Sequence, residues 1–555
     1  MTVPPPPPNQ PPGPDGYGHL PGPPQGYGYG YPQGPNPYAQ QPQPQPQQQP
    51  QQPQGWGPYP GQGGGYPPQT PPQTPPGQGG GGPARNKRTP VIVAAAVAGA
   101  LVLGAGAYFA FADGAGHDKP TAQGSADPSA PASPDKGDGK GDGKGAAPKP
   151  DINSGRKPGE DKVLWVQTNT VDLPGAGADA PAQWVVGDTV VKAAYKSVTA
   201  YGVSDGKERW TVLFPNKICT ATHLTTTDGK TVLGYMDGQS ENAKCNQLKM
   251  IDLKAGKEGW NKEVPSEGLF DIMVSPTLAI SGDTVTVSRM GPTSAFKVST
   301  GDKLWARTGE PTTDPGGCLP EKYAGGPKLI GVARCTDDGE EVQGSDPVTG
   351  KTTWFYKLPK DWKVSRVYSV DPVVVDVANK QKQERAIAVI GSDGKLRTQL
   401  SGEGSFNAQC DNVLLDRYLQ SCWGAVVDTR ANSIYLPTDG KSNEIVAFDL
   451  NTGKAKWRTP AEKDRRMLPL KAENGQLYAY VEAEKDKGGE VLAIPAAGGK
   501  PTTVLRNPSP PAATVENNIA APQIDYADGR LFVSVTALRG SAKGVDEELL
   551  MAFGK

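Results

Sequence analysis

Six cysteines and three histidines are the side chains of this chain most typical of zinc sites and of thiol or imidazole catalysis. No Cys-x-x-Cys pair is present, so the ligand spacing of a zinc site is missing. His223 stands without a serine or cysteine nucleophile motif, which favours a solvent-facing or hydrogen-bonded loop residue over a catalytic base. No glycine-rich stretch has the strand-Gly-x-Gly-x-x-Gly-helix context of a phosphate site. We therefore expect no catalytic residue, no cofactor and no bound metal.

A repeated phrase predicts the elements that position these residues. Residues 447–457 read Ala-Phe-Asp-Leu-Asn-Thr-Gly-Lys-Ala-Lys-Trp, and further copies place their tryptophans 45 to 50 residues apart. Each phrase predicts a hairpin in which the glycine takes a positive φ and the next strand carries tryptophan to a buried face. The expected turn glycines are Gly206, Gly256, Gly301, Gly350, Gly394 and Gly453. The tryptophans expected to dock neighbouring blades are Trp165, Trp210, Trp260, Trp305, Trp354 and Trp457.

The period predicts an all-β fold, an eight-bladed β-propeller. A second strand pair precedes most phrases, which gives about four strands per unit. Threonine replaces tryptophan after Gly394, a seventh unit ends at Gly499 without tryptophan, and the last unit lacks an outer strand. The strand around Trp165 supplies that missing strand, and pairing it with the C-terminal unit removes both open sheet edges. Seven blades is the competing count, because the unit between Val367 and Leu400 is weakly marked.

Composition divides the chain into segments with different roles. Residues 1–83 are rich in Pro, Gln, Gly and Tyr and predict a disordered cytoplasmic tail. Residues 84–90 form a basic juxtamembrane segment, and 91–112 predict a single transmembrane helix. Residues 113–160 predict a flexible extracytoplasmic linker, and 161–555 the propeller.

The flanking charges predict the orientation in the plasma membrane. Basic residues precede the apolar segment and Asp113 follows it, so the positive-inside rule puts the N-terminus in the cytoplasm and the propeller outside. The alternative of a cleaved signal peptide is disfavoured because the segment begins after about ninety residues. A net charge of −1 gives no support for nucleic-acid binding.

All six cysteines lie beyond the membrane segment, which is consistent with disulfides in an oxidising compartment. Six cysteines allow 15 connectivities. Sequence neighbours fall within single blades or blade junctions, which favours three pairs between neighbours. These pairs are Cys219 with Cys245, Cys318 with Cys335, and Cys410 with Cys422.

The full phrase at Ala447, Asp449, Thr452, Gly453 and Trp457 resembles the tryptophan-docking repeat of the pyrroloquinoline-quinone (PQQ)-like propellers. That group includes quinoprotein dehydrogenases, BamB-type assembly lipoproteins and membrane-anchored actinobacterial propellers, and the segment order here is most similar to the last. Quinoprotein dehydrogenases resemble one another in a vicinal Cys-Cys disulfide over the quinone. This sequence has no adjacent cysteine pair. The resemblance therefore implies the fold without the dehydrogenase activity.

Binding is the remaining function class. The first hypothesis is a non-catalytic module or scaffold for an unknown protein, peptide or cell-envelope ligand, using loops such as Thr308–Lys328 and Leu400–Gly424. An alternative is a sensor that passes a signal to the cytoplasmic tail, although a flexible linker transmits conformation poorly. A PQQ-dependent dehydrogenase is the third alternative.

Overall fold

The computed structural model describes residues 151–268, 271–308, 317–406, 408–410, 419–420, 422–540 and 547–555. The predicted tail, basic segment and transmembrane helix lie outside these residues, as does the linker before Asp151. Within the described part of the chain, no helix is long and apolar enough to span a bilayer. The structure therefore concerns the propeller and the residues just before it.

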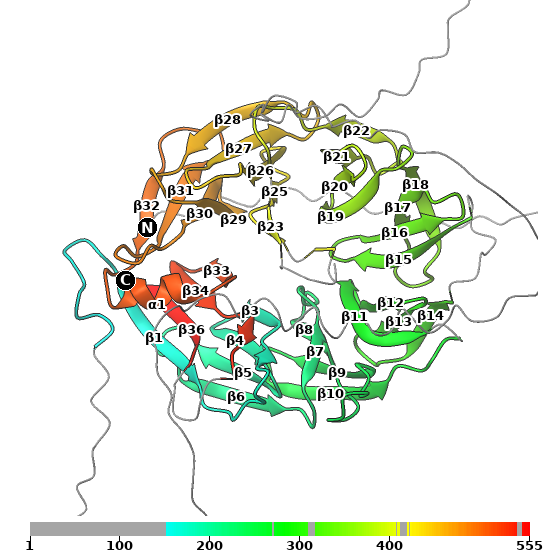
Figure 1. Cartoon of the computed structure of the whole chain (residues 1–555), viewed down its shortest axis with the longest axis horizontal. Coiled ribbons are helices and arrows are strands. Elements are labelled where there is room, and N and C mark those ends of the chain that lie inside the picture. Colours follow the sequence, from blue (N-terminus) through cyan, green and yellow to red (C-terminus); the bar gives the residue numbers. More distant parts are fainter. Residues whose placement is uncertain are drawn as a thin grey trace, which may run out of the picture. The chain divides into compact units, whose positions relative to one another are not determined.

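Eight four-stranded antiparallel sheets stand around a central axis, which confirms the count of eight blades (Figure 1). Blade 1 contains β3 (Ala182–Val186), β4 (Thr189–Ala194), β5 (Ser197–Gly202) and β6 (Glu208–Leu213). Blade 2 contains β7 (Ile218–Ala221), β8 (Lys230–Tyr235), β9 (Gln247–Asp252) and β10 (Lys257–Glu263). Blade 3 contains β11 (Ile272–Ser281), β12 (Thr284–Met290), β13 (Thr293–Lys297) and β14 (Lys303–Arg307). Blade 4 contains β15 (Cys318–Ala324), β16 (Leu329–Cys335), β17 (Glu340–Ser345) and β18 (Thr352–Lys357).

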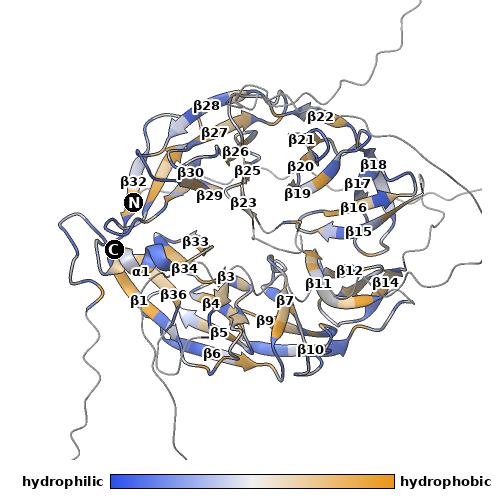
Figure 2. Ribbon diagram, viewed as in Figure 1, coloured by the Kyte–Doolittle hydropathy of each residue, from blue (hydrophilic) through white to orange (hydrophobic). Residues whose placement is uncertain are grey.

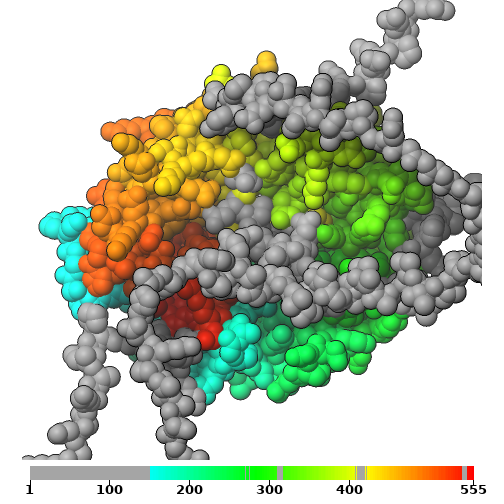
Figure 3. Space-filling model, viewed as in Figure 1, coloured from blue at the N-terminus to red at the C-terminus, as the bar shows by residue number. Residues whose placement is uncertain are grey.

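The remaining blades follow in chain order, as the colours of Figure 3 show from green to red. Blade 5 contains β19 (Lys363–Val370), β20 (Val373–Asn379), β21 (Glu384–Ile390) and β22 (Leu396–Gln399). Blade 6 contains β25 (Val426–Asp428), β26 (Ser433–Pro437), β27 (Glu444–Asp449) and β28 (Ala455–Pro460). Blade 7 contains β29 (Met467–Glu473), β30 (Gln476–Val481), β31 (Glu490–Pro495) and β32 (Thr502–Arg506). Blade 8 contains β33 (Gln523–Ala527), β34 (Arg530–Ser534), β36 (Glu547–Gly554) and β1 (Lys162–Asn169).

Five further elements lie outside the eight sheets. Two short pairs are β2 (Ala178–Asp179) with β35 (Ala537–Leu538), and β23 (Gln409–Cys410) with β24 (Cys422–Trp423). Helix α1 (Ala512–Asn518) lies between blades 7 and 8. The middle strands of the blades are the most buried, whereas an outer strand such as β28 has mainly exposed residues and is largely blue in Figure 2.

The two faces of the ring differ in the turns that they carry. In each blade the inner strand begins on one face, which we call the start face. The opposite face, which we call the turn face, carries the turn between the first two strands and the repeated Asp-x-x-Thr-Gly turn. Backbone hydrogen bonds hold these two turns together, as where Val298 N donates to Asp283 O at 2.8 Å. The aspartate of the phrase caps its own turn, because Asp449 Oδ1 accepts from the Thr452 amide at 2.8 Å.

Each tryptophan of the repeat packs on the turn glycine of the next blade. The glycines have positive φ, and a Cβ on them would lie no more than 2.8 Å from an indole atom. The pairs are Trp165–Gly206, Trp210–Gly256, Trp260–Gly301, Trp305–Gly350 and Trp457–Gly498. Several indole N–H groups also donate to a carbonyl of that next blade, such as Trp260 to Val298 at 2.7 Å and Trp457 to Ala496 at 3.0 Å. Only glycine leaves room for this packing.

Blades with weaker sequence copies use other contacts. Trp354 lies beside Gly394 less closely, because a Cβ added to Gly394 would lie 3.3 Å from Trp354 Cε3. Gly453 packs against Thr398 and the Gln399 carbonyl, because blade 5 has threonine where other blades have tryptophan. The glycine under Trp457 is Gly498, directly before the Gly499 that ends the predicted seventh unit.

Strand β1 closes the ring by pairing with the C-terminal strand, as the sequence predicts. The antiparallel register runs from Lys162 opposite Gly554 to Asn169 opposite Glu547. Trp165 then donates from blade 8 to the Val203 carbonyl of blade 1 at 3.2 Å. The first and last strands of the propeller thus form one sheet, which leaves neither edge open.

Residues just before β1 form hydrogen bonds with blade 7 and with the loop that follows it. The Asp161 amide donates to the Arg506 carbonyl at 2.7 Å, and the Arg506 amide donates to Asp161 Oδ2 at 2.8 Å. Glu160 accepts from the Ser509 hydroxyl at 2.7 Å and from its amide at 2.9 Å. Residues 151–160, assigned to the linker by composition, therefore already pack on the propeller.

Replacement of Gly301 by alanine tests the docking contact. Its φ is +73°, and a Cβ there would lie 2.6 Å from the Trp260 ring. Gly282 in the same blade has a φ of +58° with no atom within 4 Å of an added Cβ, so Gly282→Ala is the matched control. We expect Gly301→Ala to lower the free energy of unfolding by about 1–3 kcal/mol more than the control, because overpacking adds to the backbone cost. Denaturant unfolding measures the free energy of unfolding of both variants. An equal loss of stability in Gly301→Ala and Gly282→Ala would contradict the docking role.

Candidate functional site: clefts on the two faces

The predicted disulfides stiffen inner strands. Cys219 in β7 is bonded to Cys245, and Cys318 in β15 is bonded to Cys335 in β16. Cys410 and Cys422 occupy opposite positions in β23 and β24, and Cys422 is disulfide-bonded. The described pairs agree with the pairing between sequence neighbours.

Leu419 and Gln420, in the insertion between blades 5 and 6, bond to inner parts of the ring, whereas the sequence predicts variable surface at Leu400–Gly424. Gln420 Oε1 accepts from the Gly325 amide at 2.6 Å, and its Nε2 donates to the Gly325 carbonyl at 2.7 Å. The Val367 amide donates to the Leu419 carbonyl at 2.8 Å. The insertion is thereby bonded to the inner parts of blades 4 and 5, and β23 lies inside the ring in Figure 1.

A small pocket lies beside these contacts. A pocket lined by His223, Tyr323, Leu419, Gln420 and part of β11 has a volume of about 10 Å³. That is about the space that a single water molecule requires. Small-molecule sites typically need about 300–1,000 Å³. The described residues here therefore do not fit a quinone, and we derive no step through one.

His223 is a titratable residue of this pocket. Burial lowers its pKa from 6.5 to about 4, because the charged imidazolium would lose its hydration. The histidine is therefore neutral in the folded protein near pH 7. It lines the closed pocket as a structural residue, with no nucleophile assigned to it.

Acid titration tests the burial of His223. The folded pKa lies below the unfolded value, so its contribution is fully present above pH 6.5 and is lost as the pH falls toward 4. We expect the free energy of unfolding of the wild type to fall across this window by up to about 3 kcal/mol more than that of His223→Gln. Denaturant unfolding at several pH values measures the difference. Parallel pH profiles would show that His223 is not buried in its neutral form.

Buried polar clusters elsewhere join blades. Glu516 of α1 accepts from the Tyr480 hydroxyl and from Asn507 Nδ2, both at 2.7 Å, and from the Gly489 amide at 3.1 Å. Burial raises the pKa of this carboxyl, and the three donors oppose the shift. Its partners come from blade 7 and the loop after it. The cluster therefore fixes α1 at the junction where the ring closes.

A buried ion pair supports the start of β11. The Arg289 guanidinium donates to both oxygens of Asp271 at 2.6 and 2.9 Å, and the two side chains are 0% and 1% exposed. Arg289 also donates to Ser294 Oγ at 3.1 Å. A bidentate pair with further donors fixes the backbone that leads into β11. The ion pair thereby fixes the position of Ile272 and Met273, which follow Asp271 and line a cleft.

That cleft, on the start face at blades 2 and 3 and beside β2, has a volume of about 500 Å³. Lys217, Met236, Lys244, Ile272 and Met273 are among its lining residues. The Cys219–Cys245 disulfide lies beside it, since Cys219 also lines the cleft. The cleft thus combines methionines and an isoleucine with charged groups on a stiffened frame.

Exposed apolar side chains lie on the same start face, and one of them, Ile272, lines this cleft. Ile272 is 44% exposed and Met290 is 69% exposed, and they face each other across β11 and β12. Leu213, at the end of β6, is 69% exposed and shortly precedes Lys217. We call Leu213, Ile272 and Met290 the apolar rim. Exposed apolar groups gathered at a cleft are typical of a protein-binding surface.

A second cleft of about 530 Å³ lies on the turn face between blades 6 and 7. Asp428, Arg430, Glu473 and Asn474 contribute polar side chains to it. It has no residue in common with the apolar rim. Its lining suits a polar ligand more than an apolar segment.

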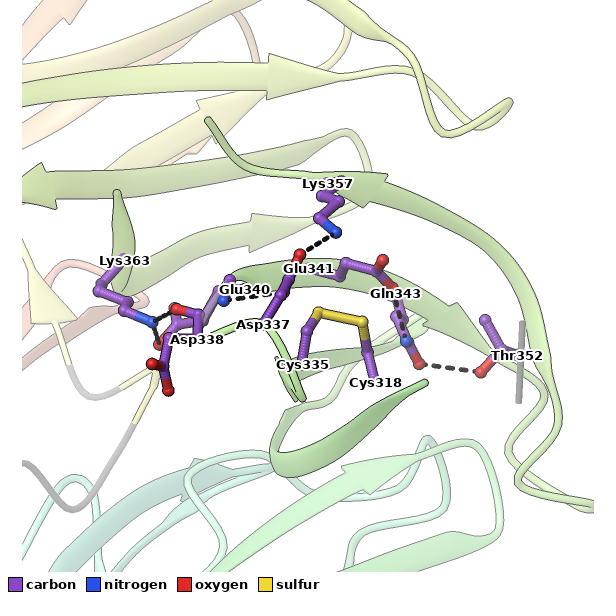
Figure 4. Close-up of a disulfide and its surroundings, with 11 residues drawn as sticks. Cys318, Cys335, Asp337, Asp338, Glu340, Glu341, Gln343, Thr352, Lys357 and Lys363 are labelled. Atoms are coloured by element: carbon purple, nitrogen blue, oxygen red, sulfur yellow. Dashed lines mark hydrogen bonds and ion pairs between the residues drawn. A yellow bond between two sulfur atoms is a disulfide. The ribbon is translucent and has the colours of Figure 1, made fainter. Parts of the chain in front are cut away.

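The described residues contain a single group of three side chains with metal-ligand chemistry, namely Cys318, Cys335 and Glu341. The two cysteines are joined as a disulfide (Figure 4). Burial raises the pKa of Glu341, and a hydrogen bond from Gln343 partly opposes that rise. Glu341 was not singled out by the sequence, because strand pairing brings it to the cysteines from β17.

The chain is a β-propeller repeat protein. Residues 156–315 match the family model described as outer membrane protein assembly factor BamB. Among solved structures, BamB from Moraxella catarrhalis is 14% identical, with a TM-score of 0.38 over 70% of this chain and 100% of that one. A quinohemoprotein alcohol dehydrogenase from Comamonas testosteroni is 14% identical, with a TM-score of 0.41 over 71% and 76% of the two chains. No curated protein matches the chain.

Proposed function

We propose that the propeller is a non-catalytic binding module whose start face, over blades 1 to 3, holds a segment of a protein partner. One observation carries this proposal. The start face has a cleft of about 500 Å³, which Ile272 of the apolar rim lines together with Met236 and Met273. A cleft of that size can take several side chains of an extended segment. The matched family model is described as an assembly factor, which supports a role in binding other proteins.

The chemistry of the cleft indicates the kind of segment that it takes. Met236 and Met273 offer adaptable apolar contacts, which suit side chains of varied shape. Lys217, Lys244 and Glu241 at the same cleft provide polar contacts of both signs. We propose a partner segment with one or two apolar anchors flanked by polar residues.

The predicted anchor and orientation complete the proposal. A transmembrane helix at 91–112 would hold the propeller outside the plasma membrane, with the tail in the cytoplasm. The dehydrogenase alternative is disfavoured by the missing adjacent cysteine pair. The sensor alternative would use the same cleft and adds a response of the tail.

Site-specific photo-cross-linking in cells tests the proposed face. A photoreactive phenylalanine analogue is placed at Met290 of the apolar rim and, as control, at Val348, which is 60% exposed on the turn face. We expect a discrete protein adduct from Met290 that a second probe at Ile272 reproduces, and no such adduct from Val348. Reversal of the charge at Lys217 should lower the yield of the adduct from Met290. The same adducts from Met290 and Val348, or none from the apolar rim, would contradict the proposal.

A further inference from the structure

We propose that Cys318, Cys335 and Glu341 form a redox-controlled site for a thiophilic divalent cation such as Zn²⁺. The site is closed while the cysteines are oxidised and opens when they are reduced. It lies in blade 4 and shares no residue with the start-face cleft. The inference is therefore independent of the proposed binding function.

The three potential ligands already lie close together. One ligand atom from each residue lies within 4.8 Å of the others. Zinc binds thiolate at about 2.3 Å and carboxylate at about 2.0–2.2 Å, so ligands on opposite sides of one ion are about 4 Å apart. Small side-chain rotations from the observed positions would meet this requirement once the S–S bond is broken.

The strands hold this arrangement without the disulfide. Cys318 and Cys335 are direct neighbours in the β15–β16 register, and Glu341 is opposite Ala333 in the β16–β17 register. The three residues are 2%, 5% and 1% exposed. Reduction removes one covalent bond, whereas the ladder hydrogen bonds of this sheet remain. The thiols would thus stay opposite each other beside the carboxylate.

Outer contacts orient the Glu341 carboxylate, as Figure 4 shows. Gln343 Nε2 donates to Glu341 Oε2 at 3.0 Å, and the Thr352 hydroxyl donates to Gln343 Oε1 at 2.9 Å. Such supporting hydrogen bonds are typical of metal-binding carboxylates. A disulfide has no proton to donate to a carboxylate, so the disulfide does not explain why an acid is buried beside it.

The blade 2 disulfide provides an internal comparison. Cys219 and Cys245 also join an inner strand to its own blade. Among the residues that the structure describes, no third ligand joins that pair. The carboxylate is thus a specific feature of blade 4.

The chemistry balances with a dithiol as reductant. The reductant transfers two electrons and two protons, the Cys318–Cys335 bond breaks, and the reductant leaves as its own disulfide. Cation binding then displaces the protons of the two thiols, which become thiolate ligands, and the Glu341 carboxylate completes three protein ligands. Reoxidation releases the cation and restores the disulfide.

Titration of the reduced full-length protein with Co²⁺ under anaerobic conditions tests the site, because thiolate ligation of Co²⁺ gives a charge-transfer absorption band. We expect a single Co²⁺ per chain with that band, displaced by Zn²⁺ and absent from the oxidised protein. Cys219→Ser/Cys245→Ser should retain the band, and Cys318→Ser/Cys335→Ser should lose it. Gln343→Ala, which keeps all three ligands, should weaken Co²⁺ binding by roughly 10–100-fold.

Two results would overturn the inference. One is a reduced wild-type protein that gives no thiolate band, and the other is a band that survives in Cys318→Ser/Cys335→Ser. If the double variant does not fold, Glu341→Gln replaces it as the test. An affinity for Co²⁺ that equals the wild type in a folded Glu341→Gln protein also overturns the assignment of three ligands.

Discussion

The contact between an indole and the turn glycine of the next blade is the interaction on which this propeller depends. A single four-stranded sheet leaves apolar faces exposed, and the ring forms because each blade covers its neighbour. Trp260 illustrates how one residue does this, since it fills the space above Gly301 and also donates to the Val298 carbonyl. The glycine is necessary for two reasons: it adopts the positive φ of the turn, and its missing side chain leaves room for the indole.

Ring closure is a consequence of this contact, since an array of such blades always leaves one indole and one turn without partners unless the ends meet. Strand β1 resolves this by joining the C-terminal sheet and bringing Trp165 onto Gly206. The contacts of Glu160 and Asp161 with blade 7 cover the remaining junction. Inside the ring, Gln420 is bonded to Gly325 of blade 4.

The sequence predicts the periodic part of this molecule well. Blade number, the role of Trp165 and the described disulfide pairs follow from local spacing, because a repeat imposes the same geometry on each copy. The axial contact of Gln420 could not be predicted, because it joins residues far apart in the chain through an insertion that breaks the period. Glu341 and the apolar rim were missed for the same reason. Their neighbours come from other strands, and no local motif marks them.

Hydrogen exchange on a Trp165→Ala variant tests the ring closure most directly. The control is Trp362→Ala, which removes another buried indole that lies away from the closure. The account predicts that Trp165→Ala speeds amide exchange in β36 of blade 8 and in β5 and β6 of blade 1, while blades 3 to 6 keep their protection. Trp362→Ala should leave β36 protected. Unchanged exchange at β36 in Trp165→Ala, or an equal loss of protection in all eight blades, would contradict the claim that this one indole closes the ring.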